Sequence, residues 1–98
     1  MKSENLMELA VKLDKGIANL IDVREVEEFE ESHINGAINL PLSVLEERWQ
    51  ELDSNRQYDV ICKAGVRSAR ACEFLEDKGF DVINVEGGMS QVPEEWLP

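Results

Sequence analysis

The sequence has few of the residues that build covalently linked or metal-held folds. Its two cysteines, Cys62 and Cys72, are too few for the disulfide framework of a small secreted protein. They lie ten positions apart, and the single histidine, His33, is distant from both, so no metal-binding spacing is present. We therefore expect neither a metal nor another cofactor.

Long apolar segments are also absent. No run approaches the roughly 20 residues that span a bilayer, and the opening Met-Lys-Ser-Glu-Asn lacks the apolar stretch of a signal peptide. A reducing cytoplasm is therefore the expected compartment. Basic residues are scarce as well, since 10 lysines and arginines stand against 21 aspartates and glutamates, for a net charge of −11. This excess of acid argues against nucleic acid and against anionic membrane surfaces as partners.

The few basic residues are unevenly distributed. Residues 63–70 contain three cations and no acid, and without them the rest of the chain carries a charge of −14. A local basic spot on an acidic body is a candidate binding site for a small anion.

The chain is long enough for one small domain, residues 1–98, and its apolar share of 43% allows a packed core. Ser3 is predicted to cap a helix that ends at Gly16, and Ser43 with Glu46 forms a predicted capping box for a helix presenting Leu45, Trp49 and Leu52. The other predicted elements are strands at 18–23, 37–40, 58–61 and 82–85 and helices at 24–31 and 67–78. This alternation predicts the α/β class, with a small, mainly parallel sheet flanked by helices on both faces.

The segment Cys62-Lys63-Ala64-Gly65-Val66-Arg67-Ser68 concentrates the chemistry. Ligands of parallel sheets bind where strands end and helices begin, and Cys62 follows a predicted strand. The amides of such a loop and the start of the next helix can surround the sulfur, and Gly65 allows the positive φ that this requires. Arg67 adds a charged fork and Ser68 a hydroxyl. We therefore predict an ionised, nucleophilic thiol at position 62, open to a small donor.

Four segments, in order along the chain, resemble the rhodanese family of sulfurtransferases. Residues 62–68 resemble its active-site pattern Cys-x-x-Gly-x-Arg-Ser, and residues 20–25 resemble its first-strand motif. Residues 33–41 resemble its His-Ile-x-Gly-Ala-x-Asn segment, which ends in a hydrophobic residue and proline, and residues 85–89 resemble its closing Gly-Gly stretch. The resemblance covers nearly the whole chain.

The resemblance implies an α/β domain that carries a transferable sulfur as a persulfide on Cys62. The donor would be a small anion such as thiosulfate, and the acceptor would be cyanide, a thiol or a protein. The amides of the following residues would cradle the sulfur, while Lys63 and Arg67 would attract the donor. The expected donor-binding residues are Lys63, Ala64, Gly65, Val66, Arg67 and Ser68.

Other polar residues have two interpretations each. Asp22 ends the first predicted strand at the same sheet edge as Cys62, where it orients Arg67 or the loop, or else only caps local backbone. Cys72 is interpreted as a core residue rather than a resolving partner, and His33 as a structural residue rather than a base. The acidic pairs 27–28 and 30–31 are interpreted as a solvated surface.

Three other functions are open at this point. A cysteine-dependent phosphatase or arsenate reductase uses similar residues, but its loop has five residues between cysteine and arginine, whereas four separate Cys62 from Arg67. A non-catalytic interaction module would have the same fold. A sulfur carrier that receives its persulfide from a protein partner would have the same cysteine, and only donor assays separate it from an enzyme that uses thiosulfate.

Overall fold

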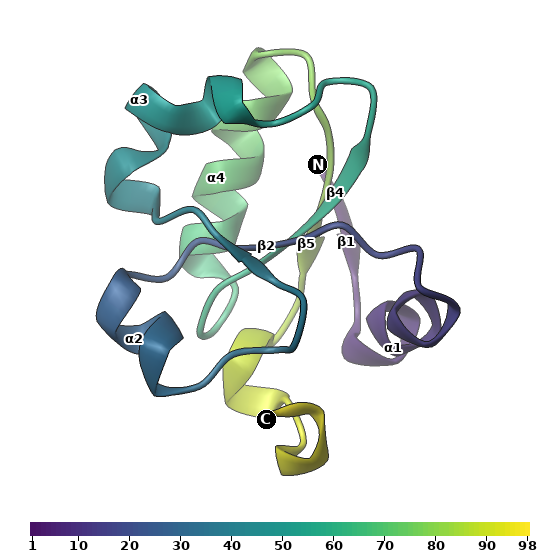
Figure 1. The fold of residues 1–98 in the computed structure, drawn as a ribbon. Helices are drawn as coiled ribbons and strands as arrows, with labels where there is room; N and C mark the ends of the chain where they lie inside the picture. The colour runs from purple at the N-terminus through teal and green to yellow at the C-terminus, as the bar shows by residue number, and fades with distance from the viewer.

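The computed structural model describes all residues from 1 to 98 as a five-stranded sheet with helices around it (Figure 1). The strands are β1 (Lys2–Glu4), β2 (Leu20–Asp22), β3 (Ile38–Asn39), β4 (Gln57–Ile61) and β5 (Asp81–Val85). The helices are α1 (Leu6–Lys15), α2 (Val26–Glu31), α3 (Leu45–Arg48) and α4 (Val66–Asp77). Short 3-10 turns cover Leu42–Val44, Trp49–Glu51, Gly88–Gln91 and Glu94–Trp96. None of the helices has the length and apolar character that crossing a membrane demands.

The sheet has the strand order β1-β5-β4-β2-β3, and every neighbouring pair is parallel. Because the strands are parallel, their carboxyl ends meet at one edge. In the register between β2 and β4, Asp22 lies opposite Ile61, the residue before Cys62. The predicted α/β fold with a parallel sheet is confirmed, and the loop after β4 lies at the sheet edge where ligands of such folds bind.

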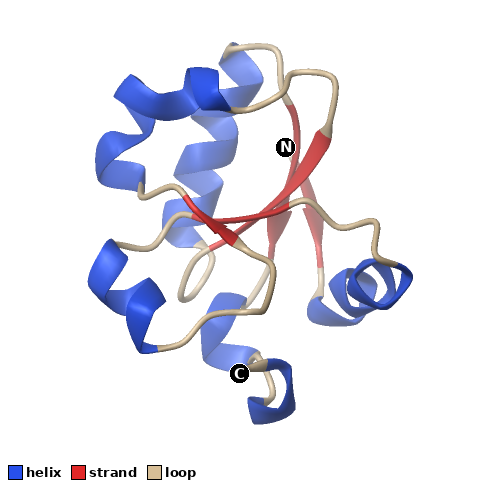
Figure 2. Ribbon diagram, viewed as in Figure 1, coloured by secondary structure: helices blue, strands red, loops and turns tan.

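Two apolar clusters cover the two faces of the sheet, with helices on both sides (Figure 2). Alternate strand residues point to opposite faces, so Ile21 and Val60 join one cluster whereas Leu20 and Ile61 join the other. The larger cluster is covered by α4, α3 and the neighbouring turns, and the smaller one by α1 and the C-terminal segment. Cys62 belongs to the larger cluster, which directs its side chain to the α4 face.

The first predicted helix begins later than the sequence pattern indicates. Ser3 lies in β1, an edge strand that pairs with β5, and therefore does not cap α1. The cap is Asn5, whose side chain accepts from the Glu8 amide at 2.9 Å while Glu8 accepts from the Asn5 amide at 3.1 Å. Strand β1 is mostly exposed and polar, so it lacks the apolar pattern by which strands are predicted.

The predicted capping box at Ser43 is also wrong. The segment begins with the 3-10 turn Leu42–Val44, and neither this turn nor α3 has a side-chain cap. Ser43 Oγ instead donates to Glu25 Oε1 at 2.7 Å. The apolar face is as predicted, since Leu45 is a core residue and Trp49 and Leu52 pack against the same cluster. Burial of that face, and not the cap, determines the course of the segment.

Candidate active site

The cradle around Cys62 is formed by the connection between β4 and α4. Strand β4 ends at Ile61, and α4 begins at Val66 after Gly65, whose φ of 101° is the left-handed conformation expected from the sequence. This turn aims the Gly65 N–H at Cys62 Sγ, with a separation of 3.1 Å. Ser68, one turn into α4, places Oγ 3.2 Å from the same sulfur. A backbone amide and a hydroxyl therefore face the thiol.

These groups shift the ionisation of the thiol. Burial acts to raise the pKa of Cys62, but the Ser68 hydroxyl and the amides of Ser68, Gly65 and Ala64 outweigh it, and the net pKa is lowered. Hydrogen bonds to the charged form favour that form. The start of α4 adds the positive end of the helix dipole at the same place. The loop therefore stabilises a thiolate, mainly with uncharged donors.

The sulfur is more enclosed than the sequence predicts. Cys62 is only 1% exposed, so the expectation of an open thiol is corrected. Cys62 packs in the larger apolar cluster, and the Gly65 amide and the Ser68 hydroxyl lie against its sulfur.

A second segment braces the loop from the other side. In the 3-10 turn Gly88–Gln91, the amide of Met89 donates to Cys62 O at 2.8 Å and the amide of Ser90 donates to Lys63 O at 2.9 Å. A Cβ at Gly88 would lie 2.4 Å from Cys62 O, too close for any side chain. Gly88 therefore permits the closest backbone contact of the site. The Gly-Gly stretch at residues 87–88 was noted as part of the family resemblance, but this contact was not predicted from the sequence.

The Arg67 side chain points to Glu28, a partner that the sequence analysis did not predict. Its guanidinium binds Glu28 of α2 with both terminal nitrogens, at 2.6 and 2.9 Å. Glu28 therefore lies at the surface, as interpreted, but its carboxylate is bound to Arg67 and is not free in solvent. This pairing spans 39 positions of sequence, and no local pattern signals it.

Asp22 does not contact Arg67, which the sequence analysis had offered as one of its possible roles. Its fully buried carboxylate accepts from Arg24, through the Arg24 amide at 3.0 Å and the guanidinium Nη2 at 2.8 Å. Arg24 Nη2 also donates to Ser32 O at 2.7 Å. Asp22 therefore organises the turn after β2, which matches the local-cap interpretation and corrects the link to Arg67.

The remaining residues of the loop are exposed. Lys63 and Ala64 lie on the surface and Val66 is 64% exposed, so Ala64 acts at the sulfur through its backbone only. The ammonium of Lys63 has no ion-pair partner. Among the three cations of residues 63–70, Arg67 alone is paired with a carboxylate.

Cys72 and His33 lie apart from this chemistry. Cys72 is fully buried, and burial raises its pKa to about 12, which keeps it a neutral thiol. His33 stacks on Phe29 with ring centroids 3.8 Å apart, and its Nδ1 lies 2.8 Å from Phe29 O. Both residues have the structural roles that the sequence favoured.

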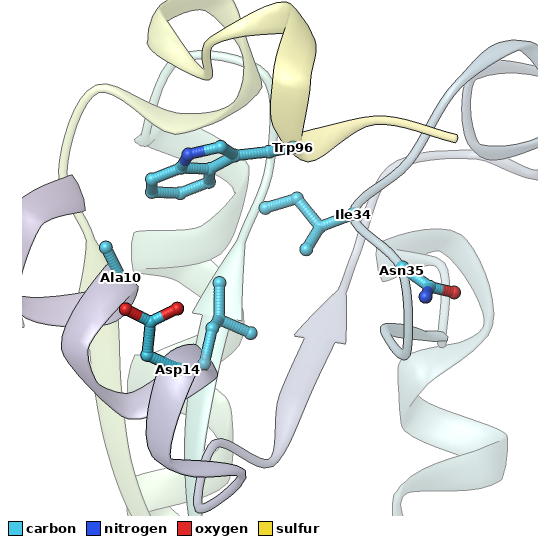
Figure 3. Close-up of a pocket in the computed structure, with 6 residues that line it drawn as sticks. Ala10, Asp14, Ile34, Asn35 and Trp96 are labelled. Atoms are coloured by element: carbon cyan, nitrogen blue, oxygen red, sulfur yellow. The ribbon is translucent and has the colours of Figure 1, made fainter.

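Two hollows on the surface leave the cysteine loop outside their walls. The larger, of about 360 Å³, lies between α1, the segment before β3 and the C-terminal turn, where Trp96 faces Ile34 and Asp14 (Figure 3). Its lining is Ala10, Leu13, Asp14, Ile34, Asn35 and Trp96. The second, of about 300 Å³, reaches α4 at Arg70. Neither includes a residue of the segment 62–68.

Comparison with known proteins decides the family. Residues 5–95 match the model of the Rhodanese-like domain. The chain belongs to the rhodanese-like family. It is 43% identical over 79 residues to the "Putative sulfurtransferase YtwF" of Bacillus subtilis (strain 168), covering 81% of this chain and 77% of that protein.

Two further likenesses bear on the rhodanese-like domain. The "Putative sulfur carrier protein YrkF" of Bacillus subtilis (strain 168) is 44% identical over 72 residues, which cover 72% of this chain but 39% of that protein. The crystal structure of a rhodanese-like domain protein from Staphylococcus aureus superposes with a TM-score of 0.94 at 36% identity, over 100% of this chain and 97% of that one. The sulfurtransferase relatives support a transferase role for this domain.

Proposed function

We propose that this protein transfers a sulfane sulfur from a small donor such as thiosulfate to a thiol or protein acceptor, through a persulfide on Cys62. The observation that carries the proposal is the pair of hydrogen-bonding groups at the sulfur. The Gly65 N–H donates to Sγ at 3.1 Å, and the Ser68 hydroxyl accepts from the neutral thiol at 3.2 Å and can donate to the thiolate once the thiol is ionised. They favour the thiolate, which is the nucleophilic form of cysteine. The sulfurtransferase relatives support the same reaction class.

The transfer takes two displacement steps on one sulfur atom. The Cys62 thiolate attacks the outer sulfur of thiosulfate, a new S–S bond forms, the donor S–S bond breaks, and sulfite leaves with the bonding electron pair. An acceptor thiolate then attacks the outer sulfur of the persulfide, and the Cys62 thiolate leaves. Because the leaving and attacking groups are already ionised, neither step needs a general base.

Each loop residue has a distinct place in this reaction. The amides of Ala64 and Gly65 and the hydroxyl of Ser68 stabilise negative charge on sulfur before and after transfer. Helix α4 begins at Val66, so the positive end of its dipole lies at the loop. Lys63, exposed and without an ion-pair partner, attracts the anionic donor. No residue of this set calls for a cofactor.

A protein-partnered sulfur carrier is the second candidate, and the similarity to the "Putative sulfur carrier protein YrkF" favours it. The two functions differ in the donor that loads Cys62. An enzyme of the thiosulfate type gains sulfur directly from thiosulfate, whereas a carrier gains it faster from the persulfide of a cysteine desulfurase. Competition between these donors in one reaction separates the two functions. The cytoplasmic location expected from the sequence stays a prediction.

Intact-mass measurement tests the proposal directly. After incubation with thiosulfate, or with a desulfurase and cysteine, the protein should gain the mass of one sulfur atom, and cyanide should remove it. Cys62→Ser should gain nothing, and the matched variant Cys72→Ser should behave as the native chain. Absence of the added sulfur with both donors, or its persistence in Cys62→Ser, would refute the proposal.

A further inference from the structure

The ion pair between Glu28 and Arg67 lies beside the cysteine loop and has no part in the transfer steps described above. Glu28 is on α2 and Arg67 is in the first turn of α4, and Figure 1 shows these two elements side by side. The contact is bidentate, at 2.6 and 2.9 Å, and each side chain is about one-third exposed, at 33% and 31%. The pair is therefore at the surface around the loop and within reach of an incoming solute.

The ion pair occupies the guanidinium of Arg67, which is the cation of the loop best suited to bind an anionic donor. A guanidinium binds an oxyanion through a planar fork, and both terminal nitrogens of Arg67 are already bound to Glu28. The hydrogen bonds to Glu28 raise the pKa of Arg67, and the position of Arg67 in the first turn of α4 places it directly after the cysteine loop. Hydrogen bonding to Arg67 lowers the pKa of Glu28 to about 2, so the carboxylate is charged at every working pH.

We infer that Glu28 determines donor specificity, selecting against free dianionic donors such as thiosulfate and in favour of sulfane donors that carry less negative charge. This inference rests on the proposed function, and it concerns the rate of donor attack and not the chemistry of the persulfide. Glu28 acts in two ways. It occupies the fork of Arg67, and its own charge repels an anion that approaches the cradle.

The charge dependence gives the inference a quantitative form. In Coulomb's law the interaction energy with a fixed charge scales with the charge of the donor. Removing one negative charge therefore stabilises a dianion by twice the free energy gained by a monoanion at the same position. The rate gain for the dianion should be the square of the gain for the monoanion.

A purely structural role is the alternative that the experiment must separate. Glu28 Oε1 also accepts from the Glu25 amide at 3.2 Å, and the ion pair fastens α2 to α4. Loss of that fastening would change the rates with all donors alike. The ratio of the rates with a dianion and a monoanion therefore reports the electrostatic role and is insensitive to the structural one.

The test compares thiosulfate with methanethiosulfonate, a donor of similar shape in which a methyl group replaces one charged oxygen. The variant is Glu28→Gln, whose amide oxygen still accepts from Arg67, and the matched control is Glu27→Gln on the same helix, which removes an exposed charge that makes no ion pair. Glu28→Gln should raise kcat/KM about tenfold for thiosulfate and about threefold for methanethiosulfonate. Glu27→Gln should change either value less than about twofold.

Equal effects on both donors, no gain in Glu28→Gln, or the same gain in Glu27→Gln would overturn the inference. If Glu28→Gln does not fold, Glu28→Ala carries the same comparison, because it also removes the charge and should raise kcat/KM for thiosulfate by more than for methanethiosulfonate. Any of these results can occur while Cys62 still gains sulfur, so failure here is distinct from failure of the proposed function.

Discussion

Substitution of Ser68 by alanine isolates the largest single contribution that lowers the pKa of Cys62. Ser68 is fully buried, and its Oγ lies 3.2 Å from the sulfur. A hydrogen bond to a charged group contributes about 1.5–3 kcal/mol. Because about 1.4 kcal/mol corresponds to a factor of ten in an equilibrium constant, Ser68→Ala should reduce the thiolate–thiol equilibrium constant by about tenfold to a hundredfold.

The assay follows thiolate formation against pH, by ultraviolet absorbance and by the rate of alkylation with iodoacetamide. Cys72, with a pKa of about 12, stays protonated over the useful range, so the signal belongs to Cys62. The loss of kcat/KM in Ser68→Ala should be large at low pH and should disappear at high pH, where the thiolate forms without help. Ser90→Ala is the matched control, because Ser90 Oγ bonds Gly87 O at 2.8 Å and not the sulfur. If the profiles of Ser68→Ala and the native chain superpose, the hydroxyl does not hold the thiolate.

Three further outcomes follow from the packing. Gly88→Ala should lower the free energy of unfolding by about 2–4 kcal/mol and abolish sulfur loading. The added Cβ would lie 2.4 Å from Cys62 O, and the φ of Gly88 is 57°. A native-like Tm in thermal denaturation would contradict this. Burial and the neighbouring Asp59 raise the pKa of Glu4 to about 7, although the Lys12 ammonium, 2.9 Å from Glu4 Oε1, acts to lower it. The contribution of Glu4 to stability is therefore complete below pH about 4.3 and is lost as pH rises through 7. Glu4→Gln should therefore be more stable than the native chain by about 1–3 kcal/mol at pH 8, and equal urea midpoints at pH 8 would exclude this. Under native conditions iodoacetamide should modify Cys62 alone, and modification of Cys72 before unfolding would contradict this expectation.

The sheet and the loop were predictable from local patterns, whereas their long-range contacts were not. Apolar strands, a cysteine after β4 and a glycine before α4 each have a local signature. Strand β1 has none, because its three residues are largely polar and its pairing depends on the backbone of β5. The brace from Gly88 was missed for a similar reason, since the contact joins two distant backbones and involves no recognisable side chain.

Charge was the least predictable property of the site. Counted along the sequence, residues 63–70 form a basic spot, and the acids of α2 form a separate acidic run. In three dimensions Glu28 is paired with Arg67, so the positive charge of residues 63–70 is partly neutralised by an acid of α2. A run of like charges predicts a solvated surface only on average, and nothing in it identifies the one member that a distant arginine binds. The enclosure of Cys62 was missed because loop closure depends on the braces around it.

The structure separates activation of the thiol from selection of the donor, and this separation predicts how two substitutions combine. Ser68 acts on the sulfur, whereas Glu28 acts on the donor, through Arg67 and through its own charge, and the two residues share no hydrogen-bonding partner. Independent sites add in free energy to within about 0.5 kcal/mol. In the double variant of Ser68→Ala and Glu28→Gln, the fold-changes in kcat/KM for thiosulfate should therefore multiply. A product that deviates by more than about threefold would mean that the ion pair also contributes to holding the thiolate, and that activation and selection are one property of the loop.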